Sequence, residues 1–161
     1  MAIILGSLSR SRIDDGVHPD LARVVYRAAS MALPEEDFSV LEGARSREQM
    51  WINYGKGRTP AQCAAKGVPT KYADPDARKV TWLSNPLMSN HRRRADGYSR
   101  AVDLAPWPTD WNDIPRFNRL ATLMFRAASV EGVQIRWGAD WDRDGRWREK
   151  GEYDSPHYEL A

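Results

Sequence analysis

The sequence has few of the residues that cross-link small proteins or bind metal ions. Only one of its 161 residues, Cys63, is a cysteine, so the chain cannot form an internal disulfide. A single cysteine suits a protein that folds in a reducing cytoplasm. The chain has three histidines, at positions 18, 91 and 157, and any metal site built on imidazole must draw on them.

Long apolar runs and a strong charge of one sign are also missing. No stretch approaches the roughly 18 apolar residues that a membrane span needs, so we expect no stable membrane insertion. The short apolar run near the start has no basic residues ahead of it, and we expect no signal peptide. The formal net charge is only +2, which cannot steer the whole molecule to an anionic polymer, and we expect no nucleic-acid partner.

The length and composition predict one domain over residues 1–161. Apolar residues make up 42% of the chain, as in ordinary globular proteins. The sequence contains no internal repeat and no low-complexity tract. A single core is therefore expected, without a second domain.

Hydrophobic periodicity predicts short strands among separate helices. Ser46 is expected to cap one helix, with Gln49 completing a capping box. The segment 55–90, rich in Gly, Pro, Lys and Asn, is expected to be a long loop broken by one strand. Helices are predicted over residues 19–32, 47–54 and 113–131. Strands are predicted over residues 38–41, 80–82, 101–104, 133–137 and 157–160. This arrangement indicates an α+β fold.

Two histidines and two aspartates form a candidate hydrolytic site. His157 follows Asp154 by three positions, and His91 precedes Asp103, which lies in a predicted strand. Two imidazoles and one carboxylate are a normal ligand set for catalytic zinc, with the fourth position left for water. Zinc lowers the pKa of such a water to about 7, and Asp154 is placed to accept its proton and pass it to a leaving amine. The spacing alone is a weak signal, because an Asp-x-x-His pattern often arises by chance.

Eight short motifs in a fixed order make the prediction much more specific. As an ordered set that spans nearly the whole chain, they resemble the zinc peptidase family of D-alanyl-D-alanine carboxypeptidases and L-alanyl-D-glutamate endopeptidases, and specifically its phage endolysins. The motifs are Gly16-Val17-His18-Pro19-Asp20-Leu21, Glu42-Gly43-Ala44-Arg45-Ser46, Gly57-Arg58-Thr59, Val80-Thr81-Trp82, Ser89-Asn90-His91, Ala101-Val102-Asp103-Leu104, Ile135-Arg136-Trp137-Gly138-Ala139-Asp140-Trp141 and Asp154-Ser155-Pro156-His157-Tyr158-Glu159-Leu160. The resemblance implies a small fold whose central antiparallel sheet carries the zinc site and is flanked by helices.

The resemblance also implies roles for individual residues. It implies that His91, Asp103 and His157 are the zinc ligands and that Asp154 is the general base. It implies that Arg45 binds the substrate carbonyl and its developing oxyanion, a role that suits a guanidinium because this group stays charged and aims several donors.

Other residues are expected to contact the substrate or to serve the fold. Ser89, Trp137 and Trp141 are predicted to line the substrate groove. His18 precedes the first predicted helix and has no metal role in the family pattern, so it is expected to be structural.

The chain departs from the family pattern between the first two expected ligands. Eleven residues separate His91 from Asp103, where the family usually has about six. We interpret the segment 92–100 as a loop insertion between ligands that remain close in space. Asp96 is the rival ligand, and Asp103 is preferred because it lies in the matching Ala-Val-Asp-Leu context. The loop 56–79 is also longer than usual.

The resemblance implies a phage endolysin that cleaves the L-alanyl-D-glutamate bond of peptidoglycan peptide stems during host lysis. We expect a monomer without a separate wall-binding module. It would stay in the host cytoplasm until a holin opens the membrane and would then act in the periplasm on the cell wall. Two alternatives remain: a D,D- or L,D-carboxypeptidase that trims terminal D-Ala, and a non-catalytic wall-binding protein.

Overall fold

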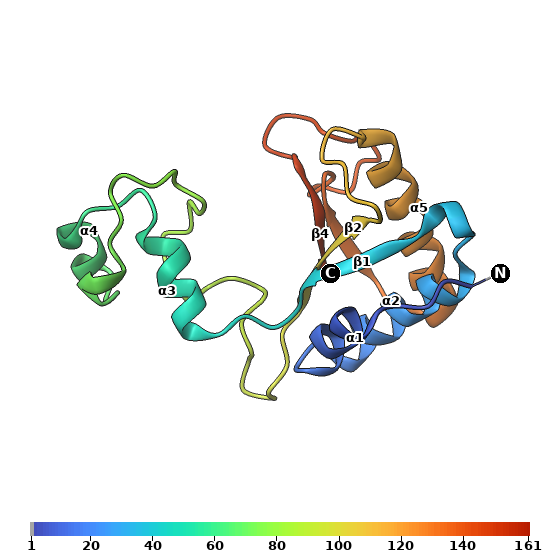
Figure 1. Cartoon of the computed structure of the whole chain (residues 1–161), viewed down its shortest axis with the longest axis horizontal. Helices are drawn as coiled ribbons and strands as arrows, with labels where there is room; N and C mark the ends of the chain where they lie inside the picture. Colours follow the sequence, from blue (N-terminus) through green and yellow to red (C-terminus); the bar gives the residue numbers. More distant parts are fainter. Residues whose placement is uncertain (1) are drawn as a thin grey trace.

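A four-stranded antiparallel sheet forms the centre of the molecule, and helices flank it (Figure 1). The structure is a computed structural model that describes residues 2–161. The strands lie in the order β1 (Phe38–Glu42), β2 (Ala101–Pro106), β4 (Asp154–Leu160) and β3 (Ile135–Gly138). The α-helices are α1 (Ser7–Asp14), α2 (Pro19–Met31), α3 (Arg47–Gly55), α4 (Pro60–Ala65) and α5 (Ile114–Glu131), with short 3-10 turns η1 (Pro34–Glu36) and η2 (Thr70–Tyr72). The predicted α+β fold with a central antiparallel sheet is confirmed.

The main core lies between the sheet and the pair α2 and α5. The two helices pack against each other, and the buried side chains of both join those of the strands in one apolar cluster. Successive side chains of a strand point to opposite faces of a sheet. Val102 and Leu104 of β2 and Tyr158 of β4 are part of this core. Asp103 and His157 alternate with them, so both belong to the opposite face of the sheet.

Both core helices begin at a capping side chain, and α5 also ends at a glycine. The Nδ1 atom of His18 accepts a hydrogen bond from the backbone N–H of Asp20 at 3.1 Å, which caps the first turn of α2. His18 therefore has the structural role that was expected. Asp113 caps α5 in the same way through the N–H of Arg116, and Gly132 ends α5 with a φ of 66°.

The predicted strand over residues 80–82 is wrong. In the part of the chain that the structure describes, no strand lies beside this segment to pair with it, and a side chain binds its backbone instead. Arg58 donates a hydrogen bond from Nη2 to the carbonyl of Thr81 at 2.8 Å, while the side chain of Trp82 is 75% exposed. A short run of β-prone residues does not form a strand without a partner, because its backbone groups find no ladder of hydrogen bonds.

Several local predictions need correction. The helix α1 was not predicted, because it buries only Ser9 and Ile13 and has little apolar periodicity. Ser46 does cap α3, but Gln49 donates its side-chain N–H to Asn53 at 2.9 Å, so the capping box is only half formed. The last strand begins at Asp154 rather than three residues later.

The segment 46–90 leaves the sheet after β1 and returns before β2, and we call it the helical excursion. In Figure 1 its helices α3 and α4 lie apart from the sheet. It contains α4 and η2 where a loop was expected, and Tyr54, Cys63 and Val68 form a small separate core. A Cβ atom on Gly55 would lie 1.8 Å from the carbonyl oxygen of Tyr72, so glycine allows α3 to approach η2 closely. Within residues 2–161, no helix has the length and apolar character that crossing a membrane requires.

Candidate active site

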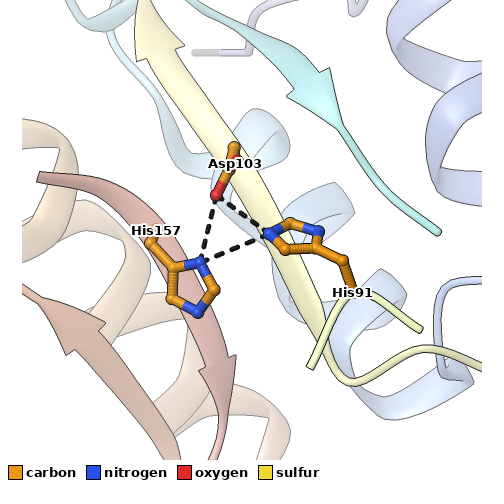
Figure 2. A group of neighbouring side chains, drawn as sticks. All are labelled: His91, Asp103 and His157. Carbon is orange, nitrogen blue, oxygen red and sulfur yellow. Dashed lines mark hydrogen bonds and ion pairs between the residues drawn. The ribbon is translucent and has the colours of Figure 1, made fainter. Parts of the chain in front are cut away.

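Three side chains that are distant in the sequence converge on the sheet face opposite the core. Asp103 on β2 and His157 on β4 are directly paired in the sheet register, and His91 reaches them from the loop before β2 (Figure 2). The Nε2 atom of His91 lies 3.2 Å from Oδ1 of Asp103 and 3.3 Å from Nδ1 of His157. His157 Nδ1 is itself 3.2 Å from the same carboxylate oxygen. The structure thus brings together the three predicted ligands.

The outer nitrogen of each imidazole has its own partner. Nδ1 of His91 lies 2.8 Å from the carbonyl oxygen of Gly43, and Nε2 of His157 lies 2.8 Å from Oε2 of Glu159. Both partners only accept hydrogen bonds, so each outer nitrogen carries a proton. A neutral imidazole has one N–H, and the inner nitrogens therefore present lone pairs to each other and to Asp103. Such an arrangement calls for a positive charge at its centre.

The pKa values of His157 and Asp103 also indicate that a positive charge is favoured in the site. Burial lowers the pKa of His157, but its hydrogen bonds to Asp103 and Glu159 outweigh burial and raise the pKa to about 9. Burial would raise the pKa of Asp103, whereas hydrogen bonds from His157 and His91 hold it well below its usual range. A proton on His157 supplies the positive charge when no metal ion does.

The spacing of the three donor atoms also suits a metal ion. Ligands at about 2.1 Å from a tetrahedral zinc ion lie about 3.4 Å from one another. The observed separations of 3.2, 3.2 and 3.3 Å are close to that value. His91, Asp103 and His157 therefore form a possible metal-binding group, with two imidazoles and one carboxylate as donors.

Asp154 lies beside this group at the start of β4. Its Oδ2 atom is 4.0 Å from Nδ1 of His157, and its side chain is 55% exposed. A Cβ atom on Gly138 would lie 2.1 Å from the Asp154 carbonyl oxygen, so a glycine at this point of β3 lets β4 begin here. Partial burial raises the pKa of Asp154 against the attraction of His157, and the charge of Asp103 raises it further. A carboxylate with a raised pKa is suited to accept and return a proton.

Arg45 is fixed at the edge of the site by three side-chain hydrogen bonds. Its Nε and Nη2 donate to the two carboxylate oxygens of Glu42 at 2.6 and 2.8 Å, and Nη1 donates to Oγ of Ser89 at 3.2 Å. A guanidinium has five N–H groups, so these three bonds leave two of the five for a ligand. The Ser89 hydroxyl also accepts the backbone N–H of His91 at 3.2 Å, which links Arg45 to the metal-binding group.

A pocket of about 490 Å³ opens above these residues. This volume is in the usual range for ligand sites. The sheet side supplies the metal-binding group, Asp154 and Trp141, whose ring centroid lies 5.3 Å from that of His157. The helical excursion supplies further lining residues: Asn53, Lys56, Val80, Thr81, Leu83, Met88, Ser89 and Asn90. Among the predicted substrate residues, Ser89 and Trp141 therefore line the pocket.

Two residues considered for the site, Trp137 and Asp96, do not line the pocket. The prediction that Trp137 lines the groove is wrong, because its side chain is fully buried and stacks on Tyr158, with Nε1 donating to the Ser155 carbonyl at 2.7 Å. The rival ligand Asp96 does not reach the metal-binding group. It forms an ion pair with Arg100 at the surface instead.

Sequence reasoning missed Glu42 and Glu159, both of which hold functional side chains in place. Glu159 was detectable, since it follows His157 by two residues on a strand and must share its face. It is buried, and hydrogen bonds from His157, Asn90 and Arg136 lower its pKa to about 2 although burial opposes them. Glu42 had no comparable signal, because its contact with Arg45 depends on the turn after β1.

The fold and the site together define a small α+β hydrolase. A family model described as phage L-alanyl-D-glutamate peptidase matches residues 1–161, and the chain belongs to this family. The L-alanyl-D-glutamate peptidase of Escherichia phage T5 is 27% identical over 151 residues, which cover 90% of this chain and 89% of that protein. The predicted enzyme class, a phage-type peptidoglycan endopeptidase, is confirmed.

A solved structure supports the fold. The chain is similar to the Serratia marcescens L-Ala D-Glu endopeptidase ChiX with a TM-score of 0.61 and 24% sequence identity, over 98% of this chain and 90% of that one. At this level of identity the similarity establishes the shared architecture.

Proposed function

We propose that this peptidase is a zinc-dependent endolysin that hydrolyses the L-alanyl-D-glutamate bond in peptidoglycan peptide stems. The choice of bond is supported by the family and by the name of the phage T5 relative. The observation that carries the zinc proposal is the convergence of three side-chain donor atoms, one each from His91, Asp103 and His157, on one point. These residues would hold the ion.

Bound zinc would supply Lewis-acid chemistry, since it polarises a carbonyl and lowers the pKa of water. Asp154 would accept the proton of the attacking water and deliver it to the leaving amine. Its position on the pocket wall, 4.0 Å from His157 Nδ1, supports this role. Its raised pKa brings it closer to neutrality, where one group can both accept and donate a proton.

Arg45 would stabilise the negative charge that develops on the scissile carbonyl oxygen. Glu42 and Ser89 hold its guanidinium before substrate arrives, so no reorganisation is needed during the reaction. Two N–H groups of Arg45 remain for the oxyanion.

The substrate would lie between the sheet and the helical excursion. Trp141 offers an apolar wall next to His157, and Lys56 places a positive charge on the other side of the pocket. Peptide stems carry carboxylates, which a lysine can attract. We further propose that the protein is a single-domain monomer that waits in the host cytoplasm and reaches the wall after a holin opens the membrane.

The test is hydrolysis of purified sacculi, measured as new free amino groups. We expect release of amines that a chelator abolishes and added zinc restores, with product masses that place the new amino terminus on D-glutamate. Loss of terminal D-Ala alone would instead identify a carboxypeptidase. Binding to sacculi without any new amine would identify a non-catalytic wall-binding protein.

A further inference from the structure

Glu159 is a buried carboxylate that the proposed chemistry does not use. It follows His157 by two residues on β4, and its side chain is 4% exposed. Its Oε2 atom accepts hydrogen bonds from His157 Nε2 at 2.8 Å and from Asn90 Nδ2 at 2.9 Å. Its Oε1 atom accepts a hydrogen bond from Arg136. A buried charge with this many donors is costly to build, which calls for an explanation.

We propose that Glu159 is a positioning residue that fixes the tautomer of His157 and so presents Nδ1 to the metal ion. This inference rests on the proposed zinc site. An ionised carboxylate only accepts hydrogen bonds, so the single proton of a neutral His157 ring must stay on Nε2. The lone pair of Nδ1 is then directed at the point that Asp103 and His91 share.

The two imidazoles of the site turn different ring nitrogens inward. His91 gives its Nδ1 proton to the neutral carbonyl of Gly43 and turns Nε2 inward. His157 gives its Nε2 proton to a charged carboxylate and turns Nδ1 inward. A charged acceptor makes the ring a stronger donor toward a metal ion than a carbonyl does. Glu159 should therefore contribute to metal affinity as well as to orientation.

Other contacts hold Glu159 and the His157 ring in place. The guanidinium of Arg136, which binds Glu159, lies 5.7 Å from the ring centroid of Trp141. Trp141 in turn contacts the His157 ring, with the centroids 5.3 Å apart. The imidazole is thus supported at its outer nitrogen by the carboxylate and on its side by the indole, and Arg136 connects the two supports.

The experiment measures zinc affinity and ring protonation in Glu159→Gln, with Glu159→Ala as a second variant. Glu131→Gln is the matched control, because Glu131 also forms ion pairs with arginines, Arg23 and Arg27, but lies away from the pocket. Zinc affinity is measured by competition with a chromophoric chelator. The ring nitrogens are followed by long-range proton–nitrogen NMR on protein labelled at histidine.

We expect Glu159→Gln to weaken zinc binding by about 10- to 100-fold and Glu131→Gln to leave it unchanged. In the unaltered zinc protein, Nε2 of His157 should be protonated and Nδ1 should show the shift of a metal-bound nitrogen, and this pattern should be lost or mixed in the variants. Equal zinc affinity and unchanged His157 signals in Glu159→Gln would overturn the inference, as would equal losses in the control. If the unaltered protein bound no zinc, the proposed function itself would fail along with it.

Discussion

The sheet and the helical excursion form opposite walls of one pocket but are stabilised very differently. The catalytic wall rests on the main core, where strands β2 and β4 are backed by α2 and α5. The excursion has only the small core around Tyr54, and polar contacts supplement it. Arg58 donates to the carbonyls of Tyr54 and Thr81 and lies over the Tyr54 ring. The proposed chemistry therefore lies on the wall that the larger core supports, and we expect the other wall to open more easily.

The largest effect should come from the base on the sheet wall. We expect Asp154→Asn to lower kcat by about 100- to 10,000-fold, because an amide cannot accept the proton of the attacking water. Zinc content and melting temperature should stay unchanged, since Asp154 is half-exposed and is not a ligand in the proposal. Amine release from sacculi measures the loss. The control is Asp76→Asn on the exposed surface of the excursion, and a kcat within a few-fold of the unaltered enzyme would exclude Asp154 as the base.

The next largest effect should come from Arg45, which lies where the chain passes from the sheet to the helical excursion. Arg45→Lys should lower kcat by about 100- to 1,000-fold, because lysine keeps the charge but loses the fork that binds Glu42 and the oxyanion together. Arg47→Lys, at the first residue of α3 and outside the pocket lining, serves as control. Steady-state kinetics on muropeptides measures kcat and KM separately. A rise in KM with kcat preserved would mean that Arg45 only binds the ground state.

A weaker effect is expected from loosening the excursion itself. Arg58→Ala truncates a residue that is 8% exposed and leaves two carbonyls without their donor, which should destabilise the excursion by about 1–3 kcal/mol. Hydrogen exchange should accelerate in residues 47–82 while β2 and β4 stay protected, and KM should rise more than kcat falls. Arg78→Ala, exposed on the same segment, is the control. Equal acceleration in the sheet would show that the two walls unfold as one unit.

The smallest effect should come from the inserted loop beside the catalytic wall. The Arg100 guanidinium holds the pKa of Asp96 at about 2, below the ordinary 3.8. The stability that this pair contributes is therefore present above about pH 4 and is lost as the pH falls toward 2. Asp96→Asn should leave zinc content and activity unchanged and lower the melting temperature by about 2 °C at pH 6. That difference should shrink between pH 4 and pH 2, and loss of zinc from this variant would restore Asp96 as a ligand candidate.

Much of the fold could be predicted from the sequence because local rules govern it. The apolar stripes predicted α2 and α5, and the alternation around Asp103 predicted β2. Local rules failed where the outcome depended on a distant partner. Residues 80–82 have strand-like composition but no neighbouring strand, and Trp137 is buried because Tyr158 stacks on it from β4.

The candidate site was predictable as a set of residues but not as an arrangement. Resemblance to a family selected His91, Asp103 and His157 despite the longer spacing between the first two. Sequence context favoured Asp103 over Asp96 but left the choice open. The pairing of β2 with β4 places Asp103 opposite His157, while Asp96 stays with Arg100.

By itself, the sequence determined which residues are available for chemistry: three imidazoles, one thiol, and acidic residues at spacings that a strand or turn can present. It also determined α2, α3, α5 and most strands, because periodicity and capping act within a few residues. Only the tertiary structure decided which nitrogen of each imidazole faces inward, since Gly43 and Glu159 reach them from other parts of the chain. The same holds for the pocket, whose two walls meet only after residues 46–90 fold back toward the sheet.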